Sequence, residues 1–251
     1  DEGVDILYET EAIDIDMQDG KFQSATLQRD GENYLVHARA LIAAAGGFEA
    51  NIDWLRESWG PAAENFRIRG TPYNRGSLLK VLLSKGAEQI GAPDQCHAVA
   101  IDARAPKFDG GIATRLDCIV FGIVVNEHAQ RFYDEGEDFW PKRYAIWGRL
   151  VAAQPNQIAY AIIESSATGL FMPSIFPAIE ADSLEELAAK IHLEPPALRR
   201  TVDEFNEAVE EGSFDPAELD NCHTRDLHPP KSHWARKLEN GPFQAYPLAP
   251  G

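Results

Sequence analysis

The sequence predicts an α/β region followed by an α+β region in a chain of 251 residues. Alternating short strands near the start indicate an antiparallel meander, and the continuous apolar run after them is typical of a strand buried on both faces. Capped helical segments dominate the last third of the chain. We place the first region at residues 1–90 and the second at residues 91–240, with 241–251 leading back toward the first.

The first region begins with the meander, expected over residues 4–37. Asp19-Gly20 and Asp30-Gly31 are hairpin-turn sequences, and apolar and polar side chains alternate between the turns. Residues 40–45 are uniformly apolar, so we expect them to form a strand of a parallel sheet that ends at Gly46-Gly47.

The remaining elements follow from capping residues and apolar patterning. Asn51 and Ser183 suit N-caps, Gly86 suits a helix end, and Pro195-Pro196 suit a helix start. The expected helices are 51–58, 78–83, 143–153, 182–188 and 197–210. The expected strands are 123–125 and 157–163, and residues 212–240 should be a loop.

Charge and composition narrow the function classes. The net charge of −17 disfavours nucleic acid as a partner, because so acidic a chain repels phosphates. Residues 99–150 are nearly neutral, with seven basic and eight acidic side chains, which suits a local anion site or arises by chance. The three cysteines form no CxxC pair, so we expect no disulfide framework, no metal site and a reducing, cytoplasmic compartment. No apolar run reaches the roughly 20 residues of a transmembrane helix.

Five segments occur in an order that carries a family resemblance. They are Gly46–Asn51, Thr71–Gly76, Gln95–His97, Ile123–Glu135 and Gly241–Gly251. In this order the chain resembles the flavoproteins of the fumarate reductase/succinate dehydrogenase family. The most specific segment is Ile123–Glu135, with its Val-Asn and Arg-Phe-x-Asp-Glu elements. The amino-acid sequence of residues 130–149 is most similar to that of tricarballylate dehydrogenases.

The resemblance implies FAD as the cofactor and a Rossmann-like FAD-binding domain with an inserted substrate-capping domain. The implied cofactor contacts are Ala44, Ala45, Gly46, Gly47, Asn74 and Gly76. Asn74-Arg75-Gly76 departs from the family's Thr-Gly-Asp-Gly pattern, so a side-chain contact by the family aspartate is not expected. The family's Gly-x-Gly-x-x-Gly and its C-terminal FAD segment are expected outside this chain, which should therefore bind FAD weakly and be inactive alone.

The resemblance also implies site residues. Arg143 would be the catalytic arginine that exchanges a proton, with Lys142 and Arg149 as alternatives. His97 would be catalytic beside it, and Gln95, Thr114 and Arg115 would bind the substrate carboxylates. The family's Thr-Glu-x-x-Arg proton path is replaced by Thr114–Cys118, so a fumarate reductase relay is not expected. Arg115 either binds a substrate carboxylate with two hydrogen bonds or pairs with Asp117 or another nearby acidic side chain.

The implied reaction is oxidation of a polycarboxylate, with tricarballylate to cis-aconitate as the leading choice. A hydride would pass to the flavin, and electrons would leave through a membrane-associated partner at the inner membrane. Three alternatives stay open at this point: a fumarate reductase-like enzyme, a ketosteroid dehydrogenase-like enzyme, and a non-catalytic module that binds polycarboxylates.

Overall fold

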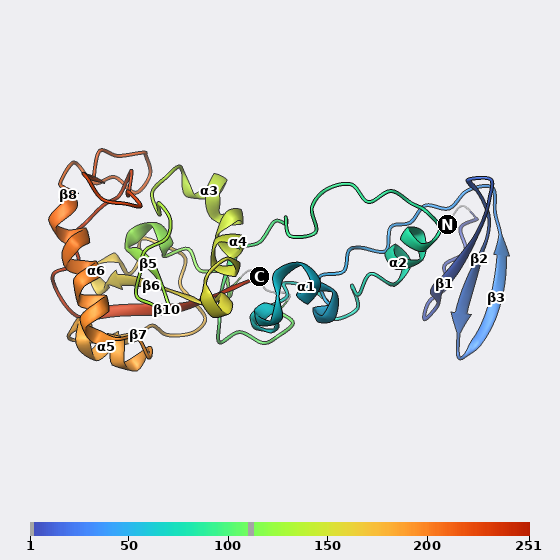
Figure 1. The fold of residues 1–251 in the computed structure, drawn as a ribbon, viewed down its shortest axis with the longest axis horizontal. Helices are drawn as coiled ribbons and strands as arrows, with labels where there is room; N and C mark the ends of the chain where they lie inside the picture. Colours follow the sequence, from blue (N-terminus) through green and yellow to red (C-terminus); the bar gives the residue numbers. More distant parts are fainter. Residues whose placement is uncertain (1–2, 110–112) are drawn as a thin grey trace.

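Two lobes joined by a middle segment make up the chain (Figure 1), for which a computed structural model describes residues 3–109 and 113–251. The smaller lobe contains β1 (Glu11–Gln18), β2 (Lys21–Arg29), β3 (Glu32–His37) and α2 (Ser77–Ser84). The middle segment contains α1 (Ile52–Trp59) and the 3₁₀-helix η1 (Pro61–Asn65). The other elements form the larger lobe, and the C-terminus lies near α1.

The meander is confirmed. Strands β1, β2 and β3 pair antiparallel in chain order. Asp19 and Gly20 both have positive φ, at 51° and 73°, and Asp30 and Gly31 repeat the pattern. Two successive left-handed residues make the tight turn whose twist matches the strands that it joins. One face of the sheet packs against α2, with Ile15, Ala25 and Leu78 buried between them.

Residues 40–45 do not form the predicted parallel strand. They are extended but unpaired among the described residues, and Ile42 is 90% exposed. An apolar run becomes a strand only where a neighbouring backbone completes its hydrogen bonds. Apolar patterning reports the tendency to be buried and not the presence of that neighbour, which is why the prediction failed for this structure.

The larger lobe is built on an antiparallel sheet in the order β4-β10-β6-β5, with β7 also pairing to β10. The strands are β4 (Ala100–Asp102), β5 (Ile123–Asn126), β6 (Ala159–Glu164), β7 (Ile179–Ala181) and β10 (Phe243–Pro250). Helices α5 (Leu184–Lys190) and α6 (Pro195–Ala208) pack on one face. Helix α4 (Trp147–Ala152) packs on the other through Trp147 and Val151. Alternate residues of each strand therefore serve two separate cores.

Capping signals located the helices well. The Asn51 side chain accepts a hydrogen bond from Trp54 N at 3.2 Å, and Ser183 accepts one from Glu186 N at 3.2 Å. The helix predicted over 143–153 is instead broken. It consists of α3 (Trp140–Arg143), the 3₁₀-helix η3 (Tyr144–Ile146) and α4. Arg143 thus ends a short helix and does not begin a long one.

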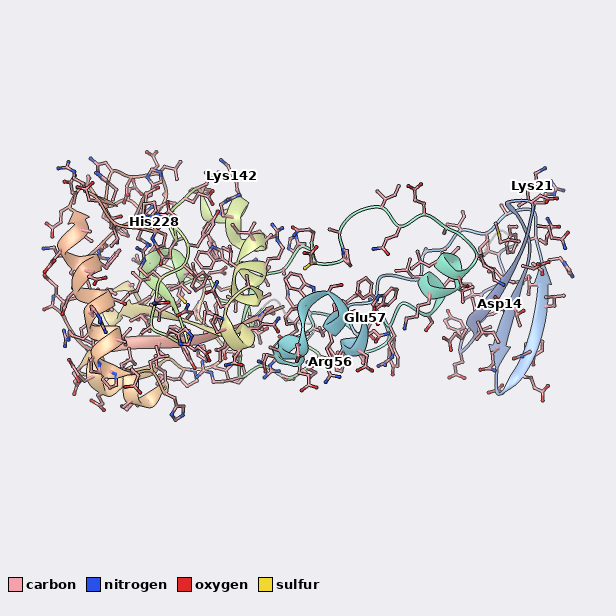
Figure 2. All side chains as sticks on the ribbon, viewed as in Figure 1. Asp14, Lys21, Arg56, Glu57, Lys142 and His228 are labelled. Atoms are coloured by element: carbon pink, nitrogen blue, oxygen red, sulfur yellow. The ribbon has the colours of Figure 1, made fainter. Side chains whose placement is uncertain are left out.

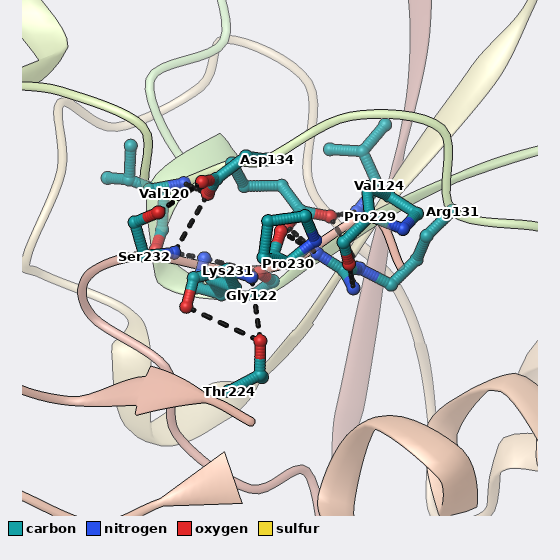
Figure 3. Close-up of polar contacts among 12 residues, drawn as sticks. Val120, Gly122, Val124, Arg131, Asp134, Thr224, Pro229, Pro230, Lys231 and Ser232 are labelled. Atoms are coloured by element: carbon teal, nitrogen blue, oxygen red, sulfur yellow. Dashed lines mark hydrogen bonds and ion pairs between the residues drawn. The ribbon is translucent and has the colours of Figure 1, made fainter. Parts of the chain in front are cut away.

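The predicted loop 212–240 is mostly irregular and is held by a buried polar network (Figure 3). The Arg131 guanidinium makes two hydrogen bonds to the Glu135 carboxylate and donates to the carbonyls of Pro229 and Pro230. Lys231 is fully buried, and its Nζ donates to the carbonyls of Val120 and Gly122, each at 2.8 Å. The Arg-Phe-x-Asp-Glu segment therefore has an architectural role here.

The other elements are short. They are η2 (Ile119–Phe121), η4 (Pro155–Gln157), η5 (Ser165–Ala167) and the paired strands β8 (Val209–Glu210) and β9 (His223–Thr224). Most of the segment 241–251, expected as a connection back to the first region, is the buried strand β10. Only its end reaches the middle segment, where Pro250 O accepts a hydrogen bond from Arg67 N at 2.8 Å.

Candidate functional site

A cavity of about 1130 Å³ opens between the middle segment, α2, residues 87–98 and the start of α4. Its lining includes the aromatic residues Phe48 and Trp54 and the polar residues Gln95, His97 and Arg149. The site predicted from the sequence is therefore brought together in part, since Gly47, Gln95 and His97 line this cavity.

Gly46 and Asn74 approach each other at one edge of the cavity. Gly46 has φ of 74°, and a Cβ there would lie 3.0 Å from Oδ1 of Asn74. Asn74 donates from Nδ2 to Glu49 at 2.6 Å and accepts from Ala50 N at 3.0 Å. The backbone turn at Gly46 thus favours glycine because of its conformation, and a Cβ there would press on the Asn74 side chain. Ala44 and Ala45 are exposed and lead into this turn.

Gly76 is packed as closely at the N-terminus of α2. Its φ is 75°, and a Cβ there would lie 2.5 Å from the Trp54 ring and 2.7 Å from Phe48 Cβ. Asn51 holds this turn by donating from Nδ2 to the carbonyl of Arg75 at 3.0 Å. Two glycine turns and a helix N-terminus in one place suit the close backbone approach of a dinucleotide cofactor. The residues present therefore fit the expected FAD.

Gly148 sets the position of its neighbour Arg149 in the cavity wall. A Cβ on Gly148 would lie 2.6 Å from the backbone of both Ala98 and Val99, so only glycine allows α4 to come this close. Gly148 N donates to Ala98 O at 3.0 Å. This contact brings Arg149 beside the segment 95–97, and its Nη1 donates to the Gln95 side chain. Its Nε is buried and has no hydrogen-bond partner in the part of the chain that the structure describes.

His97 and Arg115 meet the same aromatic ring. The His97 ring contacts Tyr144 edge-on at a centroid distance of 5.6 Å, and the Arg115 guanidinium lies 5.0 Å from the Tyr144 centroid. Arg115 also pairs with Asp117 at 2.9 Å, as one of its two predicted alternatives stated. Thr114 is buried and donates to Asp109. Neither Thr114 nor Arg115 lines the cavity.

Arg143 has partners of its own outside the cavity lining. Its guanidinium pairs with Glu137 and donates to the Tyr133 hydroxyl at 3.1 Å. The Glu137 carboxylate holds the pKa of the Arg143 guanidinium above its ordinary value, which keeps that side chain protonated. Lys142 projects outward from the same lobe (Figure 2) and pairs with Asp138 at 3.2 Å.

Arg69 is a cavity-lining residue that the sequence reasoning missed. It lies two residues before the Thr71–Gly76 segment that carried the resemblance, and this position is the one signal that could have indicated it. In the described ranges no helix is long and apolar enough to cross a membrane, and no cluster of side chains suits a metal ion.

Comparison with protein families gives a match over the whole chain. Residues 1–251 match the family described as FAD binding domain. NADH:acrylate oxidoreductase from Vibrio harveyi is 27% identical over 256 residues. The match covers 98% of this chain and 24% of that protein, so the chain spans about a quarter of this curated relative.

Solved structures share the fold. The open conformation of a flavocytochrome c3 fumarate reductase matches 96% of this chain and 40% of its own, with a TM-score of 0.61 and 17% identity. The 3-ketosteroid Δ1-dehydrogenase from Sterolibacterium denitrificans matches 96% of this chain and 47% of its own, with a TM-score of 0.64 and 19% identity. The 3-ketosteroid Δ4-(5α)-dehydrogenase from Rhodococcus jostii matches 98% of this chain and 47% of its own, with a TM-score of 0.62 and 21% identity.

Proposed function

The chain belongs to the FAD binding domain family, and from this premise we propose that the whole protein is an FAD-dependent oxidoreductase that dehydrogenates a small polycarboxylate. Tricarballylate, oxidised to cis-aconitate, is the substrate that we propose. One observation carries this proposal: a single cavity joins the glycine turn at Gly47 to the polar wall of Gln95, His97 and Arg149.

The charge of this wall supports a carboxylate substrate. In a protein with a net charge of −17, a cavity-lining arginine whose Nε has no partner among the described residues is a local exception. Guanidinium groups bind carboxylates with two parallel hydrogen bonds, which gives both affinity and orientation. Two of the relatives are named for acrylate and fumarate, which are small carboxylates.

The proposed roles follow from position. FAD, when bound, supplies the hydride chemistry. Arg149 and Gln95 hold the substrate carboxylates, His97 accepts the proton that leaves next to a carboxylate, and the fixed charge of Arg149 stabilises the negative charge that develops as it leaves. We assign the substrate-facing role to Arg149 in place of Arg143, because Arg143 is already paired with Glu137. Thr114 and Arg115 then act outside the cavity lining. Thr114 donates a hydrogen bond to Asp109, and Arg115 packs on the Tyr144 ring.

A ketosteroid dehydrogenase is the second candidate function. The cavity also has an apolar wall that includes Phe66, Leu79 and Leu83, which would suit a steroid ring system. Two solved structures with this fold are named for ketosteroids. A neutral steroid has no group that needs the charge of Arg149, and this difference makes the two functions separable.

A dye-linked assay tests the proposal. The whole protein, purified with FAD, is given tricarballylate, succinate or 4-androstene-3,17-dione together with an artificial electron acceptor. We expect tricarballylate to be the best substrate. Dye reduction with the steroid alone would replace the proposal by the second function, and binding of tricarballylate without dye reduction would indicate a non-catalytic module.

We further propose that a membrane-associated partner accepts the electrons in the cytoplasm. The support is the expected reducing compartment and the similarity to fumarate reductase. Pull-down of the whole protein from solubilised inner membranes, followed by reoxidation of its flavin, would test this part.

A further inference from the structure

Arg69 is an unpaired cation in the cavity wall. Its Nε is buried without a hydrogen-bond partner, and within the described residues Arg69 makes no hydrogen bond or ion pair. Most arginines of the larger lobe and middle segment have a carboxylate or carbonyl partner, as Arg67, Arg104 and Arg131 do. Arg69 is half-buried, and its buried Nε lacks a partner, which is costly for a polar group, so the arrangement suits an anion that arrives from outside the chain.

The backbone that leads into Arg69 is held by hydrogen bonds to distant parts of the chain, so its position is set by the fold. Ile68 N donates to Lys107 O at 2.8 Å, and Asp109 N donates back to Ile68 O at 2.8 Å. Arg67 N is bonded to Pro250 O at the end of β10. These bonds fix the backbone from which the Arg69 side chain enters the cavity wall, while its guanidinium has no acceptor among the described residues.

The carboxylates that line the cavity do not neutralise Arg69. Glu49 is occupied by the Asn74 amide. Glu57 and Glu88 are exposed, and Figure 2 shows Glu57 on α1 in the middle segment. Neither is within ion-pair distance of Arg69, since the structure records no salt bridge for this arginine in its described ranges.

We propose that Arg69 is a second carboxylate-binding residue of this cavity, separate from the Gln95–His97–Arg149 wall, and that it selects a substrate with more than one carboxylate. This inference rests on the proposed function. Arg149 leaves α4, whereas Arg69 leaves the segment after η1, so the two cations approach a ligand from different elements. A monocarboxylate has one group for these two cations, whereas a di- or tricarboxylate has a group for each.

An anion at Arg69 could come from two sources, a substrate carboxylate or a phosphate of FAD. Both would form charge-assisted hydrogen bonds with a guanidinium. They differ in what the loss of Arg69 removes. Loss of a substrate contact weakens ligand binding and spares flavin content, whereas loss of a phosphate contact lowers flavin content.

The test uses the whole flavoprotein with Arg69→Gln and Arg69→Lys. Arg200→Gln, at an exposed position of α6, is the matched control. Titration calorimetry gives the Kd of cis-aconitate, and absorbance gives the flavin-to-protein ratio. We expect Arg69→Gln to raise the Kd about 10- to 100-fold with flavin content unchanged. Arg69→Lys should recover part of that loss, and Arg200→Gln should match the wild type.

An unchanged Kd in Arg69→Gln would overturn the inference and leave the proposed function standing. Loss of flavin, with a normal Kd once FAD is added back, would assign Arg69 to the cofactor and also overturn it. A wild-type protein that binds neither cis-aconitate nor succinate would overturn the proposed function together with this subsite.

Discussion

Arg143 and Arg149 lie in one short stretch of sequence, and their hydrogen-bond partners separate their roles. Arg143 is paired with Glu137, while Arg149 lines the cavity and touches the Gln95 side chain. A carboxylate partner neutralises a guanidinium and favours its protonated form, which leaves Arg143 poorly suited to bind an anion or to accept a proton.

The first prediction compares Arg149→Ala with Arg143→Ala in the whole protein. Loss of a preorganised cation that stabilises developing charge should lower kcat/KM for tricarballylate about 100-fold or more in Arg149→Ala. Arg143→Ala should lower it less than about 10-fold, because it breaks only a partly exposed ion pair. Steady-state kinetics with flavin content as the control would check this, and the reverse order would return the catalytic role to Arg143.

Lys231 shows how burial changes a titration at the residue scale. Burial lowers the pKa of the Lys231 ammonium to about 8 from an ordinary value of 10.5. The folded state therefore binds fewer protons than the unfolded state between these two pH values. Stability linked to Lys231 must rise with pH across this window, and below pH 8 it stays level because Lys231 is then protonated in both states.

The second prediction concerns Lys231→Met. The free energy of unfolding of the wild type minus that of the variant should increase between pH 8 and 10.5, by roughly 3 kcal/mol at most. Tyrosines and cysteines that titrate in this range cancel in the difference. Lys142→Met, at an exposed lysine of the same lobe, is the control for the loss of a surface ammonium group. Urea unfolding at several pH values measures both, and parallel curves for Lys231→Met would contradict the assignment.

At the scale of elements, the contact between α4 and residues 98–99 connects packing to the site. Trp147 is buried in the core behind the sheet, while Gly148 touches the backbone of Ala98 and Val99 and the next residue enters the cavity. Three successive residues of one helical turn thus pack in the core, contact the neighbouring backbone and line the cavity.

The third prediction is that Gly148→Ala destabilises the protein by about 1–3 kcal/mol, because the new methyl group overlaps backbone atoms that cannot move aside. Helix propensity alone predicts the opposite sign, a gain of about 1 kcal/mol. The variant should also weaken cis-aconitate binding, since Arg149 moves with α4. Denaturant unfolding measures the change in stability, and calorimetry measures the change in binding. A stabilised variant would show that the backbone of Ala98 and Val99 can move to make room for the methyl group.

At the scale of the whole molecule, the two lobes have separate cores. The buried cluster of the smaller lobe consists of Ile15, Ala25 and Leu78, and it shares no member with the clusters around β5 and β6. Strand β3 is exposed along its full length. Since stability follows local burial, the lobes should open independently.

The fourth prediction follows for hydrogen exchange of the chain 1–251. Amides of β1–β3 should exchange at least tens of times faster than those of β5 and β6, which are enclosed by helices on both faces. Mass spectrometry of peptic fragments would measure the two sets in one sample. Equal protection of both sets would mean that the lobes unfold as one cooperative unit.

Local signals in the sequence were sufficient for much of the fold. The Asp-Gly turns specified the meander, and Asn51, Ser183 and Pro195 located helix starts. The sequence missed β10, because Pro247 and Pro250 cannot donate to a ladder and make the segment read as a connection. That strand is nevertheless buried between β4 and β6.

The sequence by itself determined the cofactor family and the glycine turn at Gly46-Gly47, and it singled out Gln95 and His97, which line the cavity. Only the tertiary structure decided that Arg149 and Arg69, and not Arg143 or Arg115, line the cavity. The reason is physical. Turns and caps depend on neighbours within a few residues, whereas the direction of an arginine depends on carboxylates and backbone contacts that folding brings from distant parts of the chain.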